Sequence, residues 1–85
     1  MQTTAIELIA KERERQIAKG WTPEHDDKEH ADGWLADTAA AVLTQPRGNV
    51  LAIFIVKRHS RIEQLTIAAA LVVAEIERLQ RLPKG

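Results

Sequence analysis

Residues 60–79 decide the fold of this chain, and they read SRIEQLTIAAALVVAEIERL. Ser60 and Glu63 have the spacing of a capping box, in which the serine oxygen accepts an early backbone N–H and the glutamate reaches back to the cap. Beyond the cap, apolar side chains recur at steps of three and four residues as far as Leu82, which is the period of an α-helix. These side chains are Ile62, Leu65, Ala69, Val72, Val73, Ile76 and Leu79. Residues 67–74 are apolar on every side, so we expect a central helix that several neighbours contact.

Two further helices are predicted upstream. The first covers residues 3–19, with Thr3 or Thr4 as its cap and Gly20 as its stop. Its apolar side chains fall mostly along one stripe, which also contains Arg13. The members of that stripe are Ile6, Leu8, Ile9, Arg13 and Ile17.

The second upstream helix is predicted over residues 31–44, and Pro46 and Gly48 end it. Trp34 is one of the side chains that this helix has available for burial, and we expect both tryptophans to act as core anchors. Between the two helices, a threonine before a proline at 22–23 predicts one helical turn over residues 23–27.

Residues 50–56, which read VLAIFIV, leave two conformations open. Seven apolar and mostly β-branched residues favour a buried strand on propensity, yet no other segment offers that strand a partner. The segment is therefore either a helical turn that leads toward the last helix or an extended piece at a homodimer contact. The predicted fold is all-α, a three- to four-helix bundle in a single domain over residues 1–85, with 50–56 extended as the alternative.

Composition narrows the classes of function. The 85 residues make one small domain, and 45% of them are apolar, which argues against disorder. Twelve acids balance twelve bases, but residues 1–44 carry a net charge of −4 and residues 45–85 a net charge of +4. This balance argues against a nucleic-acid binder with a basic surface throughout. Without cysteine there is no thiolate metal site, and the first ten residues lack a secretory signal, so we expect a cytoplasmic protein with no membrane segment.

Residues 12–27, which read ERERQIAKGWTPEHDD, resemble a family of small phage and prophage proteins that mostly lack an assigned function. Those proteins also tend to end with a helix like residues 68–79. In their middle they usually carry a tryptophan- and proline-rich stretch, whereas residues 45–57 are short and aliphatic here. The resemblance implies an origin in a mobile element, a helical fold and a location in the cytoplasm of a bacterial host; it implies no reaction.

Carboxylates and histidines gather between the first two predicted helices. Oxygen ligands together with imidazole suit Mg²⁺, Mn²⁺ or a similar ion. The candidate metal ligands are Glu12, Glu24, His25, Asp26, Asp27 and Glu75. The alternatives are that these residues cap helices and form salt bridges, with Arg13 reaching an acid such as Asp27 or Glu75, or that they form a surface for a partner.

A metal site of this kind resembles that of the all-α nucleotide pyrophosphohydrolases of the MazG type. Such enzymes hold magnesium with a Glu-x-x-Glu pair and a Glu-x-x-Asp pair. Residues 24–27 and 29–32 both fit Glu-x-x-Asp, but the Glu-x-x-Glu pair is absent. The resemblance implies a metal-dependent hydrolase that uses Glu12, Glu24, Asp27 and Glu75.

The first functional prediction is instead a non-enzymatic phage or prophage accessory protein that needs no cofactor and acts by macromolecular binding or self-association. We expect a homodimer, or an acidic face displayed to a host or phage protein with a basic surface. The candidate interaction residues are Trp21, His30, Asp32, Ile53 and Phe54. A basic group near the start of the last helix is the candidate for phosphate contact, and it comprises Arg47, Lys57, Arg58, His59 and Arg61.

Overall fold

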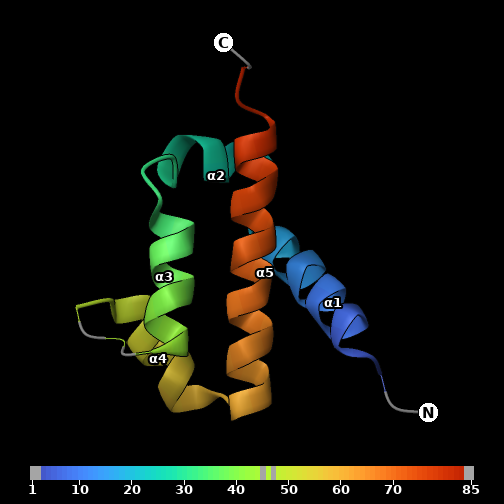
Figure 1. The fold of residues 1–85 in the computed structure, drawn as a ribbon, viewed down its shortest axis with the longest axis vertical. Helices are drawn as coiled ribbons and strands as arrows, with labels where there is room; N and C mark the ends of the chain where they lie inside the picture. Colours follow the sequence, from blue (N-terminus) through green and yellow to red (C-terminus); the bar gives the residue numbers. More distant parts are fainter. Residues whose placement is uncertain (1–2, 45, 47, 84–85) are drawn as a thin grey trace.

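The computed structural model describes residues 3–44, 46 and 48–83, and these fold into five α-helices without a strand (Figure 1). The helices are α1 (Ala5–Ala18), α2 (Pro23–Glu29), α3 (Trp34–Leu43), α4 (Val50–Arg58) and α5 (Arg61–Gln80). The predicted all-α class is confirmed for the described residues. Arg47, one of the candidate phosphate contacts, lies outside them.

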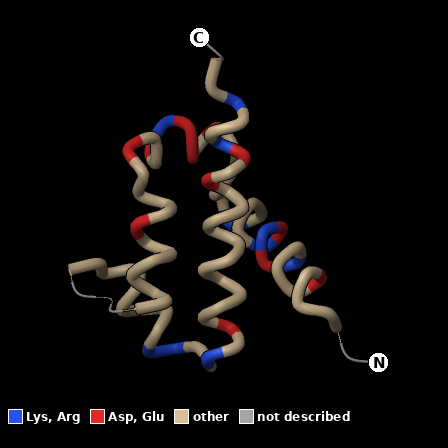
Figure 2. The backbone as a smooth tube through the Cα atoms, viewed as in Figure 1, with Lys and Arg blue, Asp and Glu red and all other residues tan. Residues whose placement is uncertain are grey.

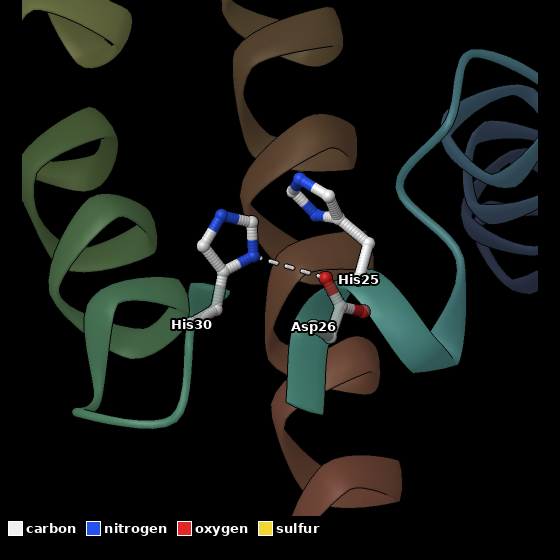
Figure 3. Close-up of side chains that lie close together, drawn as sticks. All are labelled: His25, Asp26 and His30. Atoms are coloured by element: carbon white, nitrogen blue, oxygen red, sulfur yellow. Dashed lines mark hydrogen bonds and ion pairs between the residues drawn. The ribbon is translucent and has the colours of Figure 1, made fainter. Parts of the chain in front are cut away.

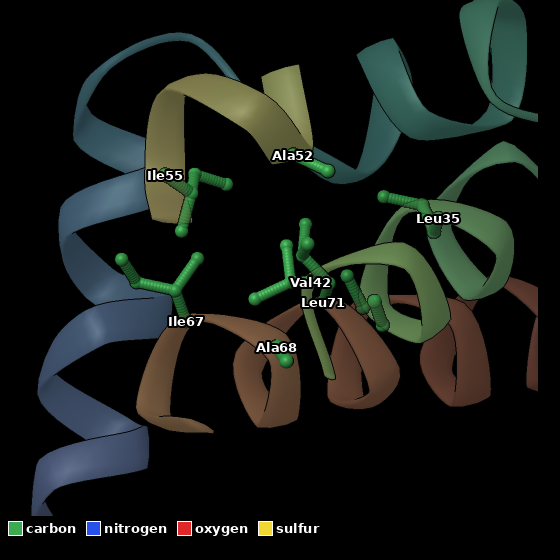
Figure 4. Packing of buried hydrophobic residues seen from close by; sticks show 9 residues of the cluster. Leu35, Val42, Ala52, Ile55, Ile67, Ala68 and Leu71 are labelled. Atoms are coloured by element: carbon green, nitrogen blue, oxygen red, sulfur yellow. The ribbon is translucent and has the colours of Figure 1, made fainter. Parts of the chain in front are cut away.

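The long helix α5 is central, as its sequence predicts. It contacts each of the other four helices, most extensively α3 and α1. In Figure 1, α3 runs antiparallel along one side of α5, α1 crosses it at an angle, and α2 and α4 lie at opposite ends of the pair. The buried apolar cluster comes from α3, α4 and α5 (Figure 4), and it comprises Leu35, Ala39, Val42, Ala52, Ile55, Ile67, Ala68, Leu71 and Ala74.

Side-chain caps fix where the helices begin. Ser60 Oγ accepts a hydrogen bond from the Glu63 backbone N–H at 3.2 Å, and Glu63 Oε1 accepts one from the Ser60 N–H at 2.8 Å. Thr4 and Glu7 form the same reciprocal box at the start of α1. Each box satisfies backbone donors that the first turn of a helix leaves free. The predicted cap of the last helix is therefore confirmed, and Thr4 rather than Thr3 caps the first.

Residues 50–56 are helical, so the extended alternative is wrong. Asn49 caps α4: its Oδ1 accepts from the Ala52 N–H at 2.9 Å, while its Nδ2 donates to Thr38 Oγ1 at 3.1 Å. This second bond ties the start of α4 to buried Thr38 in the middle of α3. Ala52 and Ile55, three residues apart on one helical face, then enter the core. The contact with α3 outweighs the strand propensity of the β-branched run.

The helix predicted over 31–44 begins later, at Trp34. Gly33 precedes it with a φ of 91°, in the left-handed region that glycine adopts without steric cost. Asp32 Oδ1 accepts a hydrogen bond from the Trp34 N–H at 3.2 Å. This contact closes a local turn just before α3, whose N-cap is Gly33, and Asp32 itself is exposed.

The apolar stripe predicted for the first helix does not face the core as a whole. Ile6 is 79% exposed and Ile17 is 38% exposed, whereas Arg13 and Gln16 are buried. The buried side of α1 is therefore set largely by polar residues. The side chain of Arg13, the one charged member of the predicted stripe, extends from α1 to the candidate site at α2.

Candidate functional site

The candidate site is centred on α2, a two-turn helix whose start the sequence specifies. Thr22 Oγ1 accepts a hydrogen bond from the His25 backbone N–H at 3.2 Å, and Pro23 occupies the first helical position. The predicted start is confirmed, and the helix continues to Glu29, beyond the predicted end at 27. This extra half turn matters because it brings His30, the C-cap residue, beneath Asp26.

Asp26 is the fully buried carboxylate of the site, with a relative exposure of 0%. Its Oδ2 accepts from Arg13 Nη2 at 3.1 Å, and its Oδ1 lies 3.0 Å from His30 Nδ1. An ionised carboxylate only accepts hydrogen bonds, so His30 Nδ1 carries the proton in this contact. Arg13 Nη1 also donates to the Trp21 carbonyl at 3.1 Å, and Arg13 Nε lies 3.6 Å from Glu77 Oε1 on α5. The Arg13 guanidinium therefore links α1 to the segment between α1 and α2, to α2 and to α5.

Aromatic rings enclose His30. Its ring stacks on Trp34, with centroids 4.3 Å apart and an interplanar angle of 13°. The Trp21 ring lies 5.3 Å from the His30 ring, and the His25 ring meets it edge-on at 4.9 Å. Both tryptophans are half-buried and pack against the apolar core, so they anchor the site and the core together. The ring of His30 is thereby held in one orientation.

His25 completes the group. Its Nδ1 atom is buried and has no hydrogen-bond partner. Figure 3 shows the side chains of His25, Asp26 and His30 turned toward one another, and one ligand atom from each lies within 4.8 Å of the other two. Among the described residues, this is the one group of at least three histidine and carboxylate side chains with the spacing of a metal site.

Two of the other predicted metal ligands, Glu12 and Glu75, accept hydrogen bonds from basic or amide side chains. Glu12 accepts from Arg15 at 2.6 Å and from Gln16 at 3.3 Å. Glu75 accepts from Arg78 at 2.7 Å. These contacts fit the salt-bridge alternative better than a shared ion.

Asp27 and Glu24 lie on the exposed side of α2. Asp27 accepts two hydrogen bonds from the guanidinium of Arg81, and these bonds hold the pKa of the Asp27 carboxyl below its ordinary value. The expectation that Arg13 reaches an acid is confirmed, but the acid is Asp26 rather than Asp27 or Glu75, because α2 turns Asp26 inward. The metal ligands predicted from the sequence do not include His30. The signal that points to it is the four-residue spacing of Asp26 and His30, which places two side chains on one face of a helix.

The remaining interaction candidates lie on α4. Ile53 is half-buried, while Phe54 is 49% exposed and carries the Arg58 guanidinium 4.5 Å above its ring. Phe54 also lines a groove of about 300 Å³ between α1 and α4, whose floor includes Ile67 and Leu71 of α5. None of His25, Asp26 and His30 lines this groove, but Trp21 lines it and also packs against His30.

The fold and the site together define a small all-α protein with a buried ionic and aromatic cluster at one end. A comparison with protein-family models, curated proteins and solved structures finds no match for the chain. No helix among the described residues has the length and apolar character needed to cross a bilayer. Inferences about function therefore start from this chain's own residues.

Proposed function

We propose that this chain is a non-enzymatic accessory protein that acts as a homodimer, with the outer face of α5 as its interface. The observation that carries the proposal is a stripe of apolar residues on the side of α5 that the subunit leaves exposed. We call it the outer stripe, and its members are Ile62, Leu65, Ala69, Val72, Ile76 and Leu79. The five large members are 41% to 68% exposed.

The spacing of the outer stripe is that of a coiled-coil seam. Its members follow one another at steps of three, four, three, four and three residues, which is the a and d pattern of a heptad. The core uses a different face of the same helix, through Ile67, Leu71 and Ala74. A surface helix of a monomer has one apolar side, whereas α5 has two. Large exposed apolar patches of this kind mark interaction sites.

We assign a second copy in the antiparallel direction to this stripe. The stripe then matches itself about a two-fold axis: Ile62 packs on the partner's Leu79, Leu65 on the partner's Ile76, and Ala69 on the partner's Val72. The small alanine faces the valine near the axis, so the two helices approach closely there. From Ile62 to Leu79 the seam is about 26 Å long at the helical rise per residue.

The charge distribution supports the same direction. Figure 2 shows basic residues where α4 meets α5; at the opposite end, around α2, it shows several acidic residues with basic ones among them. Residues 23–32 carry five acids and one lysine. The basic end carries Lys57, Arg58 and Arg61. An antiparallel pair sets each basic end beside the partner's acidic end, whereas a parallel pair sets like charges together. The resemblance of residues 12–27 to phage and prophage proteins is consistent with an accessory role on a mobile element.

The test is the mass of the particle in solution, measured by light scattering coupled to size exclusion. We expect a dimer for the natural chain and a folded monomer for Val72→Glu, because that change buries two carboxylates near the two-fold axis. Ile6→Glu is the matched control, since it adds the same charge at a 79% exposed isoleucine of α1, away from the stripe. A monomeric natural chain, or equal loss of the dimer in both variants, would contradict the proposal.

A further inference from the structure

We propose that His25, Asp26 and His30 form a binding site for one divalent transition-metal ion of the Zn²⁺ type. The inference is independent of the dimer, because all three residues belong to α2 and its C-cap in a single chain. It also differs from the magnesium expectation. Two imidazoles and one carboxylate suit borderline ions such as Zn²⁺, whereas Mg²⁺ prefers oxygen ligands and retains several waters.

The unpartnered Nδ1 of His25 is the first support for a ligand. A buried polar atom without a hydrogen bond is costly, and native structures rarely keep one without a reason. Among the described residues three side-chain atoms are in this state, Arg13 Nε, Gln16 Oε1 and His25 Nδ1, and only His25 belongs to the group with the spacing of a metal site. A backbone bond to Thr22 fixes the helical turn that carries this side chain. A metal ion between His25 and its two neighbours supplies the partner that Nδ1 lacks.

The spacing of the group is the second support. Zinc–ligand bonds of about 2.0–2.1 Å place tetrahedral ligand atoms about 3.3 Å apart. His30 Nδ1 and Asp26 Oδ1 are already 3.0 Å apart, and all three ligand atoms lie within 4.8 Å of one another. Closure of the site needs mainly an inward movement of the His25 ring. When the ion binds, the ring proton of His30 is exchanged through solvent from Nδ1 to Nε2, so the imidazole stays neutral and the Nδ1 lone pair binds the ion.

The surrounding residues hold the ligands as outer-shell partners do in metal sites. Arg13 binds Asp26 through Oδ2, so Oδ1 remains directed at the histidines. Trp34 stacks on His30 and fixes its ring plane. The carboxylates of Asp26 and Glu77 flank the guanidinium of Arg13. Three protein ligands leave one tetrahedral position for water or an external ligand.

Calorimetric titration of the full chain with ZnCl₂ tests the site, on protein treated with a chelator and free of any histidine tag. We expect one ion per chain and a higher melting temperature at saturation, by mass action. His25→Ala and His30→Gln should each weaken Zn²⁺ binding by more than about 100-fold, since even outer-shell changes cost 10- to 100-fold.

The third histidine of the chain provides the matched control. His59 lies near Glu63 at the start of α5, so His59→Ala should bind Zn²⁺ like the natural chain. Co²⁺ absorption gives a second readout, because an ion held by two imidazoles and a carboxylate produces visible bands that His25→Ala removes. No Zn²⁺ binding at about 100 µM metal, or unchanged binding in His25→Ala, would overturn the inference. Equal loss in His59→Ala would also overturn it.

Discussion

The α2 end of the molecule and the outer stripe of α5 present their side chains in opposite ways. At the α2 end, a carboxylate with no exposed surface and a guanidinium with 6% exposure are buried and bound to one another. Along the outer stripe, isoleucine, leucine and valine side chains lie in solvent, although the same helix buries alanines on its other side. The subunit thus buries charge where it could have buried apolar surface.

The two regions differ in what completes them. Arg13, Asp26 and His30 bind one another within the chain, although Arg13 Nε and His25 Nδ1 are buried without a hydrogen-bond partner. Such a buried ionic group adds little net stability over an apolar replacement, but it is costly to break from one side. The outer stripe gains its stability only when another surface covers it. The buried group at the α2 end therefore holds the helices of one subunit together, and the outer stripe is proposed to hold two subunits together.

The largest expected effect comes from removal of one partner in the buried group. Asp26→Ala leaves the Arg13 guanidinium buried without its carboxylate and His30 without its acceptor. We expect a loss of about 3–5 kcal/mol in the free energy of unfolding, measured by urea denaturation. Asp27→Ala, one residue along and exposed, is the control and should change the midpoint little. Similar midpoints for both variants would show that burial of Asp26 is not the source of the effect.

The next effect separates the two faces of α5. Leu71 is 1% exposed and Leu79 is 50% exposed, so the same leucine-to-alanine change samples the core and the outer stripe. Leu71→Ala should cost about 2–5 kcal/mol at every protein concentration, because it leaves a cavity in the core. Leu79→Ala should matter only at concentrations where the natural chain is a dimer. Chemical denaturation at a low and a high concentration checks both, and a concentration-independent cost for Leu79→Ala would contradict the outer stripe as an interface.

The smallest expected effect is on how the melting temperature falls at acid pH. The Arg81 guanidinium lowers the pKa of Asp27, and the Ser60 backbone N–H lowers the pKa of Glu63. A carboxyl whose pKa is lower in the folded state stabilises that state above its ordinary pKa of about 4, and the gain is lost as the pH falls below it. The melting temperature should therefore fall between about pH 5 and pH 3, and less steeply in Asp27→Asn. If the melting temperatures of the natural chain and Asp27→Asn fall equally steeply with pH, this role of Arg81 is contradicted.

Local signals predicted the helices better than they predicted the site. The capping box at Ser60 and the Thr22–Pro23 pair each depend on residues within one turn, and both start a helix where expected. The conformation of residues 50–56 depends on Asn49 meeting Thr38 in another helix, which no local pattern contains. A strand partner in a second chain could not be excluded from the sequence for the same reason.

The site shows the same limit. His25, Asp26 and Asp27 are all candidates from the sequence because carboxylates and imidazole are metal ligands, but the sequence does not say which of Asp26 and Asp27 turns inward. That choice depends on how α2 sits against α1 and α5, through Arg13 and Arg81. The sequence shows the three- and four-residue steps of α5. It does not show that the core uses the face of Ile67, Leu71 and Ala74, which leaves the outer stripe exposed.

The antiparallel dimer through α5 is tested most directly by disulfide crosslinking, because the natural chain has no cysteine. The variants are Ile62→Cys, Leu79→Cys and the double variant with both changes. In the antiparallel pair, position 62 faces the partner's position 79, and equal positions lie about 26 Å apart. Mild oxidation should therefore give a covalent dimer of the double variant and little of either single variant, as judged on a non-reducing gel. Efficient crosslinking of Ile62→Cys alone, or none in the double variant, would contradict the dimer as described.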